Sequence, residues 1–399
     1  MLKEDEGKYI IDTYNRRPEA TPLLVRGSGT KVWDEEGKEY LDFVGGLAVN
    51  ALGHCHPRVV EAAKRQLDNL VHASNLYYTE AQVTLARYLV ENSCTDKVFF
   101  SNSGAEANEA AIKVARKYAQ EQVDPQRYEI ITAYNSFHGR TLATLSATGQ
   151  EKFHKGFGPL PHGFKYAYFN DVESFREQVS EKTCAVMVEP VQGEGGVYTA
   201  TREFLRDLRD LCNERNLLLI FDEVQCGMGR TGRLFAYGYY GVEPDIITLA
   251  KALGGGLPLG AMLCREKVAS SFAPGTHAST FGGNPVVCAA AVKVIEEMLS
   301  KGFLSSVEEK GSYFADKLLS LKEKFPGVIK EIRGAGLILG MEIASGAQEI
   351  QKICREQGLL INALGDSIIR FLPPLNTAQE EIDKALSILT EALNRYSAR

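Results

Sequence analysis

Short apolar runs alternate with helical patterns along the middle of the chain, and this alternation constrains the fold more than any other feature. From Lys97 onward, buried strands are indicated by KVFF, EIITAY, CAVMVEPV, NLLLIFDEV and DIITLAK, and helical patterns such as 104–119 and 202–216 lie between them. Alternation of this kind predicts a mostly parallel sheet with helices on both faces. The expected fold class is therefore α/β.

The two ends of the chain have a different, mixed pattern. Residues 30–43 favour two short strands around a turn at 34–37, and helical patterns follow at about 57–70 and 79–92. After a long helical stretch near 285–324, short strands (VIKEIRGAGLILGMEIA, GLLIN and SIIRF) alternate with helices up to the end. We predict a large ligand-binding domain over 56–309 and a smaller α+β domain that combines residues 1–55 with residues 310–399.

Composition excludes several classes of protein. The chain has 399 residues, of which 44% are hydrophobic and 24% charged, values typical of a soluble globular protein. The net charge is -6 and the basic residues are scattered, so no nucleic-acid-binding surface is predicted. No apolar run approaches the roughly 20 residues that cross a bilayer, and the charged N-terminal segment lacks the apolar stretch of a signal peptide. A cytoplasmic enzyme with neither membrane nor nucleic-acid partners is expected.

The cysteines and histidines do not predict a metal centre. Eight cysteines are spread widely without a C-x-x-C pair, which is typical of reduced, mostly buried thiols. His54-Cys55-His56 has the composition of half a metal site, but structural zinc usually needs four protein ligands and no second pair lies at a suitable spacing. We interpret the segment as a turn that leads into a helix at Pro57, and no metal is expected.

Three groups with chemical potential follow predicted strands. Asp222 comes after LLLIF, Lys251 comes after IITLA, and Ser103-Gly104-Ala105 comes after VFF and opens a helix. In a doubly wound sheet, ligands bind beyond the carboxyl ends of the strands. Backbone N–H groups at a helix start also favour an anion such as phosphate, although a simple helix cap has the same composition.

Asp222 and Lys251 are both charged residues at the ends of apolar strands, where an unpaired charge is costly to bury. An aspartate at the end of an apolar strand is costly to bury without a partner, although a helix cap or a salt bridge would satisfy it. Lys251 ends an apolar run, and a glycine cluster at 254–256 allows a ligand to approach closely. A lysine in such a place suits Schiff-base chemistry. Pyridoxal phosphate requires a lysine imine, a carboxylate at its ring nitrogen and a phosphate site, which these three groups would supply.

Six blocks in order carry a resemblance to a known family: SNSGAEANEAAIKVAR, FHGRT, EPVQGEGG, FDEVQCGMGRTG, LAKALGGGLPLGA and HASTFGGNP. They resemble the class III (ω-amino) pyridoxal-phosphate aminotransferases of fold type I, and the resemblance extends from Val32 to past Arg370. It implies a mostly parallel large domain, a smaller α+β domain, pyridoxal 5′-phosphate as cofactor and a homodimer with shared active sites.

The resemblance also implies roles around the cofactor. Lys251 and Asp222 would be the catalytic residues, with Lys251 bound to the cofactor and Asp222 paired with its ring nitrogen. The other expected cofactor contacts are to the phosphate, to the two ring faces, to the phenolic oxygen and across the dimer. In that order they are Ser103, Gly104 and Ala105; Phe137 and Val224; Gln225; and Thr280.

Four further residues would bind the substrates, again by resemblance. Arg140, with Ser279 beside it, would bind the α-carboxylate of an acylated ornithine, and Arg370 would bind the α-carboxylate of glutamate. Glu194 would cover Arg370 when the terminal amine is the reacting group and withdraw when glutamate arrives. Apart from the resemblance, either arginine could be an ordinary surface charge. Glu189 and His138 could support the site, or could belong to a strand end and a turn.

The segments YLDFVGGLAVNALGHCHP and HASNLYYTEAQVTLA, with FHGRT, resemble the branch of the family that acts on acylated ornithine. The expected reaction is transamination between N2-acetylornithine and 2-oxoglutarate, a step of arginine biosynthesis. An enzyme for N-succinylornithine or another ω-amino acid would keep the same cofactor residues. A non-enzymatic, cofactor-sensing regulator would need an added DNA-binding module, for which the pattern leaves no segment.

Overall fold

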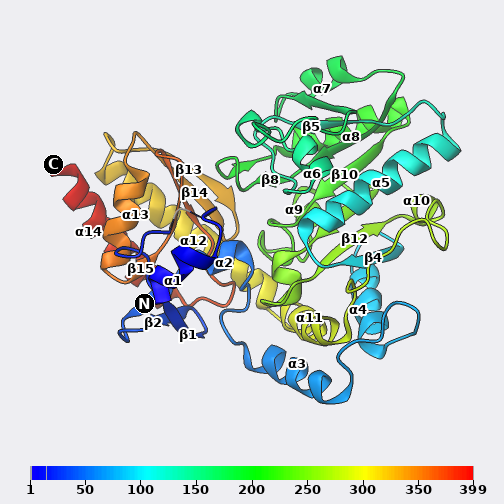
Figure 1. Ribbon diagram of the computed structural model, residues 1–399. Coiled ribbons are helices and arrows are strands. Elements are labelled where there is room, and N and C mark those ends of the chain that lie inside the picture. Colours follow the sequence, from blue (N-terminus) through cyan, green and yellow to red (C-terminus); the bar gives the residue numbers. More distant parts are fainter. Residues whose placement is uncertain (1, 15, 399) are drawn as a thin grey trace.

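The protein has two lobes, and both ends of the chain lie in the smaller one (Figure 1). The computed structural model describes residues 2–14 and 16–398. Residues 1, 15 and 399 of the predicted small domain lie outside this range. The larger lobe is built on a seven-stranded sheet, and the smaller lobe contains two four-stranded sheets. The prediction of an α/β fold with a mostly parallel, helix-flanked sheet is confirmed.

The seven-stranded sheet positions the chemistry. Its strands, in spatial order, are β4 (Lys97–Ser101), β12 (Gly260–Cys264), β11 (Ile246–Leu249), β10 (Leu218–Asp222), β7 (Thr183–Val188), β5 (Glu129–Ala133) and β6 (Phe164–Ala167). Only β12 runs antiparallel to its neighbours. Every residue of β7, β10 and β11 is buried, as expected for strands that are covered on both faces.

Helices cover this sheet and extend to one side of it (Figure 1). They are α3 (Pro57–Asn69), α4 (Glu80–Glu91), α5 (Gly104–Gln122), α6 (Leu142–Ala147), α7 (Val172–Gln178), α8 (Arg202–Arg215), α9 (Ala236–Tyr240), α10 (Glu266–Ala269) and α11 (Pro285–Met298). Local sequence sets their ends: α8 is capped at its start by Thr201, whose hydroxyl accepts a hydrogen bond from the Phe204 N–H, and at its end by the left-handed Asn216. The predicted helical stretch 285–324 is two helices, because Gly302 at φ 83° separates α11 from α12 (Phe303–Lys324).

The smaller lobe joins segments from both ends of the chain. One sheet has the order β1 (Leu24–Ser28), β2 (Lys31–Asp34), β3 (Glu39–Asp42) and β15 (Leu359–Leu360), so an early strand pairs with a late one. The other has the order β13 (Ile329–Ala335), β14 (Ile338–Ile343), β17 (Ile368–Phe371) and β16 (Asn362–Leu364).

The remaining elements of the described chain, from both lobes, are α1 (Leu2–Tyr9), α2 (Gly45–Ala48), α13 (Ala347–Glu356), α14 (Gln379–Ser397), the short pair β8 (Val191–Gln192) and β9 (Tyr198–Thr199), and two 3-10 turns, η1 (Glu151–Phe153) and η2 (Lys251–Gly254). The domain limits at 55 and 309 stay a proposal.

Two further observations complete the fold. The helices of the described chain include none with the length and apolar character that a bilayer span requires. The segment at residues 54–56 is the predicted turn before α3, and His54 Nε2 lies 2.7 Å from Asp42 Oδ2. That contact gives His54 a side-chain partner within the protein.

Candidate active site

A cavity of about 500 Å³ opens at the carboxyl edge of the seven-stranded sheet. It brings together ten of the thirteen residues that the sequence singled out as site residues, from β4–α5, the loop after β5, the loop after β8, and the ends of β10 and β11. These ten are Ser103, Gly104, Ala105, Phe137, Arg140, Glu194, Asp222, Val224, Gln225 and Lys251. Ser279, Thr280 and Arg370 are not among its lining residues.

Asp222 is the last residue of β10, and its carboxylate is held by three donors. Oδ1 accepts the N–H of Val224 at 3.0 Å. Oδ2 accepts the amide of Asn108 at 2.7 Å and lies 2.8 Å from His138 Nδ1. The side chain is only 3% exposed, so the donors offset a desolvation cost that would otherwise be prohibitive. A carboxylate fixed in this way can hold a proton on a nitrogen that approaches from the cavity.

Asn108 is a functional candidate that the sequence reasoning missed, and His138 was left undecided. Asn108 lies one turn into α5 on its buried face, among alanines, and its amide also donates to the carbonyl of His138 at 2.7 Å. A buried amide on an otherwise apolar helix face was the signal that could have revealed it. Together the two residues support the carboxylate of Asp222 from behind.

Lys251 opens the 3-10 turn η2 directly after β11, and its backbone has the unusual φ of 44°. A residue other than glycine rarely adopts this conformation, which is often found at functional sites. Burial lowers the pKa of Lys251, and the nearby Glu194 carboxylate only partly opposes that shift. A lysine with a lowered pKa has a larger fraction of neutral, nucleophilic amine.

The start of α5, where an anion site was expected, faces the cavity. The hydroxyl of Ser103 caps the helix by accepting the N–H of Glu106 at 3.2 Å, and the carbonyl of Ser103 accepts the N–H of Ala107 at 3.0 Å. Gly104 and Ala105 occupy the first two helical positions, whose N–H groups have no partner within a helix. A Cβ at Gly104 would lie 2.7 Å from a methyl of Val224, so only glycine lets this helix start approach that side chain.

Phe137 and Val224 both line the cavity, and Glu189 holds the backbone beside the phenylalanine. Glu189 follows β7 directly and accepts the Phe137 N–H at 2.9 Å. Burial, together with the charge of Asp222, raises the pKa of Glu189 well above its usual value. This contact assigns Glu189 a supporting position in the site, which the sequence had left open.

Arg370 lies on β17 and is completely buried. Its guanidinium donates to Glu194 Oε1 at 2.7 Å, to Gln225 Oε1 at 3.1 Å and to Asn362 Oδ1 at 2.7 Å. Burial alone would raise the pKa of Glu194, but the charge of Arg370 reverses this and lowers it. The pairing that the sequence led us to expect between these two side chains is therefore present, with Glu194 at the cavity and Arg370 behind it.

Arg140 lines the same cavity and is exposed. Its guanidinium carbon lies 4.0 Å from the centre of the Phe153 ring and 5.4 Å from that of Phe137. Such stacking holds a planar guanidinium while leaving its N–H groups available for a carboxylate. Arg140 at the cavity and Arg370 behind Glu194 are thus two separate cationic side chains of this region.

Ser279 and Thr280 lie outside the cavity of the single chain. Ser279 is half-buried and its hydroxyl accepts the N–H of Gly282 at 2.9 Å, whereas Thr280 is exposed. Neither position completes the cavity of its own chain. The expected roles of these two residues stay proposals.

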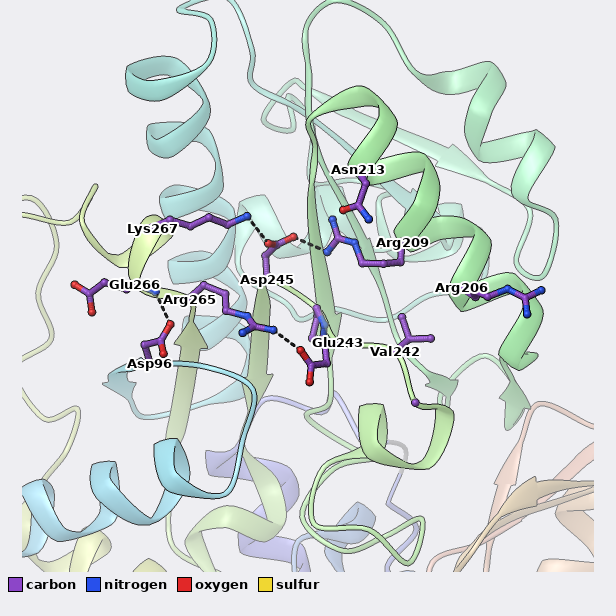
Figure 2. Close-up of a pocket in the computed structure, with 12 residues that line it drawn as sticks. Asp96, Arg206, Arg209, Asn213, Val242, Glu243, Asp245, Arg265, Glu266 and Lys267 are labelled. Atoms are coloured by element: carbon purple, nitrogen blue, oxygen red, sulfur yellow. Dashed lines mark hydrogen bonds and ion pairs between the residues drawn. The ribbon is translucent and has the colours of Figure 1, made fainter.

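A second cavity, of about 640 Å³, lies at the other edge of the same sheet (Figure 2). Its charged side chains pair with one another: Asp245 lies 2.7 Å from Arg209 and 2.9 Å from Lys267, and Arg265 lies 2.5 Å from Glu243. Because these charges are mutually compensated, we interpret this cavity as a structural ion network at the amino end of β11.

With this geometry established, the comparisons identify the family. Residues 13–393 match the family model described as Aminotransferase class-III, and the chain belongs to that family. It is 56% identical over 390 residues to the acetylornithine aminotransferase of Caldanaerobacter subterraneus subsp. tengcongensis, covering 98% of each chain. The similar solved structures include two aminotransferases of particular interest. The ornithine aminotransferase of Toxoplasma gondii ME49 has a TM-score of 0.94 and 34% identity, covering 100% of this chain and 95% of its own. The N-acetylornithine aminotransferase of Stenotrophomonas maltophilia K279a has a TM-score of 0.84 and 39% identity, covering 97% and 98%.

The cofactor of class III aminotransferases, and so of this chain, is pyridoxal 5′-phosphate, and the cavity fits it. The lining provides an amine, a fixed carboxylate, free N–H groups at a helix start, and an aromatic and an aliphatic side chain. The glycine at 104 leaves no Cβ in the space beside Val224. The donor set therefore matches the aldehyde, ring nitrogen, phosphate and ring faces of the cofactor.

Proposed function

We propose that the chain catalyses reversible transamination between N2-acetylornithine and 2-oxoglutarate, which gives N-acetylglutamate 5-semialdehyde and glutamate in arginine biosynthesis. The observation that carries the proposal is the buried Arg370–Glu194 pair in the same site as Lys251, with Arg140 also at the cavity. Such a pair suits an enzyme that alternates between two kinds of amino donor, because Glu194 compensates the buried charge of Arg370 when no substrate carboxylate does. The 56% identity to an acetylornithine aminotransferase over 98% of both chains supports the acetylated substrate.

The chain's own residues would act as follows. Lys251 Nζ would hold the cofactor covalently and, once released, would carry the proton between the reacting substrate carbon and the cofactor carbon C4′; its lowered pKa favours that task. Asp222, supported by Asn108 and His138, holds the proton on the ring nitrogen. When bound, the cofactor supplies an electron sink for the electron pair left on the substrate carbon. Ser103, with the N–H groups that follow it, holds the phosphate.

The second set of residues would fix the orientation of each substrate. Glutamate reacts at its α-carbon, so its near carboxylate falls at Arg370, from which Glu194 must withdraw. Acetylornithine reacts at its terminal amine and has no near carboxylate, so Glu194 stays paired with Arg370 and avoids leaving a buried charge alone. Arg140 binds the distant carboxylate of either substrate through a bidentate fork. Gln225 hydrogen-bonds the phenolic oxygen of the cofactor.

We further propose that the enzyme is a homodimer. Thr280 is exposed in the single chain, where it reaches no part of the cavity, and would bind the phosphate in the partner subunit's site. Ser279 would lie beside Arg140 in the completed site. Phe137 and Val224 would lie on opposite faces of the cofactor ring.

A direct comparison of amino donors tests this function. The purified holoenzyme would be assayed with acetylornithine, succinylornithine, ornithine and 4-aminobutyrate, with 2-oxoglutarate as the common acceptor. We expect kcat/KM to be highest for acetylornithine. A higher value for succinylornithine would favour an N-succinylornithine transaminase, and a higher value for either unacylated donor would refute the proposed substrate.

A further inference from the structure

A row of four residues crosses the sheet that carries Arg370. In β13, β14, β17 and β16, Arg333 pairs with Gly340, Gly340 with Arg370, and Arg370 with Asn362. Residues directly opposite in antiparallel strands point to the same face. Arg333 and Arg370 therefore lie on one face of this sheet, separated by a glycine that has no side chain.

The loop that carries Glu194 lies on this row. Close to Arg370, the Gly193 carbonyl accepts the Arg370 guanidinium at 2.9 Å. In the middle, Val197 fills the space over Gly340, where an added Cβ would lie 2.8 Å from the Val197 Cβ. The loop is thus in contact with the sheet on both sides of Glu194.

Arg333 holds the far end of the same loop. Its Nε donates to the Gly196 carbonyl at 2.9 Å. The guanidinium is itself fixed by Glu331 and Glu342, each at 2.6 Å, and lies 3.9 Å from the centre of the Tyr198 ring. The side chain is only 7% exposed, so this is a well-supported anchor and not a surface ion pair.

Between the two arginines, the glycines beside Glu194 lower the steric barrier to backbone rotation. Glu194 is followed by two glycines, of which Gly196 has a φ of 123° that other residues rarely adopt. Because Arg333 fixes the Gly196 carbonyl, rotation is confined to the residues around Glu194. The anchor then determines how readily the carboxylate returns to Arg370 after it has withdrawn.

We propose that Arg333 is a positioning residue that holds the loop end and thereby sets how strongly Glu194 covers Arg370. This inference rests on the proposed function, because it concerns the balance between the two half-reactions. Loss of the anchor weakens the covered state, which acetylornithine needs, more than the open state, which glutamate needs. If Arg333 only stabilised the fold, its loss would slow both half-reactions alike.

The test uses the purified holoenzyme with Arg333→Gln, and stopped-flow absorbance of the cofactor for each half-reaction. We expect the ratio of the acetylornithine rate to the glutamate rate to fall about tenfold, as for loss of a charge-assisted hydrogen bond. Arg209→Gln is the matched control, since Arg209 is also a mostly buried, ion-paired arginine but lies in the second cavity. It should leave the ratio unchanged. If Arg333→Gln does not fold, Arg333→Lys, which keeps the charge but loses the Nε donor, should shift the ratio in the same direction.

A double variant separates this inference from the proposed function. In Arg333→Gln/Glu194→Ala, the anchor no longer has a carboxylate to position, so the ratio should match that of Glu194→Ala alone. A multiplied shift in the double variant, or an unshifted Arg333→Gln beside a shifted Glu194→Ala, would refute the role of Arg333 only. An unshifted Glu194→Ala would refute the Glu194 exchange itself, and this inference with it.

Discussion

Replacing Arg370 with alanine should damage the glutamate half-reaction selectively. The Arg370 guanidinium is completely buried and makes four hydrogen bonds, three of them to the Gly193 carbonyl and the side chains of Glu194 and Asn362. It is therefore rigidly placed to receive a carboxylate. Removing one partner of a buried, hydrogen-bonded charge pair costs about 2–5 kcal/mol. At about 3 kcal/mol, the glutamate half-reaction should slow roughly a hundredfold.

The acetylornithine half-reaction should be affected less. Its substrate has no carboxylate near the reacting carbon, so it loses no direct contact with Arg370. Glu194, however, loses the charge that lowers its pKa against the effect of burial. In the variant, burial then raises the pKa of Glu194, and the carboxyl can become neutral instead of remaining as an unpaired buried charge. We expect a loss of about tenfold or less in this half-reaction.

Stopped-flow absorbance of the cofactor measures each half-reaction separately, in single turnovers. Two comparison variants are expected to change the two half-reactions in different directions or to different extents. Glu194→Ala should impair the acetylornithine half-reaction while sparing or improving the glutamate one, and Arg140→Ala should impair both, with acetylornithine affected most. Equal losses in the two half-reactions for Arg370→Ala and for Glu194→Ala would refute the exchange between them, but not the cofactor site.

Three further predictions follow from the site and its surroundings. Asp222→Ala should slow transamination by about a hundredfold, roughly 3 kcal/mol, while the cofactor still binds; near-normal turnover would show that another group holds the ring nitrogen. Analytical ultracentrifugation should find a dimer, and a fully active monomer would contradict the shared role of Thr280. Burial raises the pKa of Glu223 from 4.5 to about 8, so its contribution to stability is complete below 4.5 and is lost as pH rises through 8. The difference in Tm between Glu223→Gln and the unmodified chain should therefore shift in favour of the variant from about pH 5 to 8; a difference that does not change with pH would contradict the raised pKa.

The sequence predicted the central sheet well because its strands are continuous apolar runs with few alternatives. β10 ends at Asp222, and Lys251 lies two residues beyond the end of β11, as the runs LLLIF and IITLA indicated. Two strands were missed: β6 at the edge of the sheet and β12, which is the antiparallel member. The residues of β12, GAMLC, follow a glycine-rich segment, and no helical pattern lies between them and the preceding strand β11.

Contacts between segments that are distant in the chain could not be predicted from local sequence patterns. Asn108 and His138 meet at Asp222 only because α5 and the loop after β5 pack against the end of β10. The row that joins Arg333 to Arg370 likewise depends on the register of three strand pairs, which no local pattern specifies. Ser279 and Thr280 were assigned by resemblance alone, and their proposed roles need a second chain.

Mapping the covalent attachment of the cofactor tests the central claim most directly. Borohydride reduction of the yellow holoenzyme, followed by peptide mass spectrometry, should place the cofactor on Lys251. Lys251→Ala should retain some bound cofactor, remain unlabelled and lose transamination by orders of magnitude, since it lacks both the attachment and the proton carrier. Label on any other lysine of the unmodified chain would contradict the assignment of the active site.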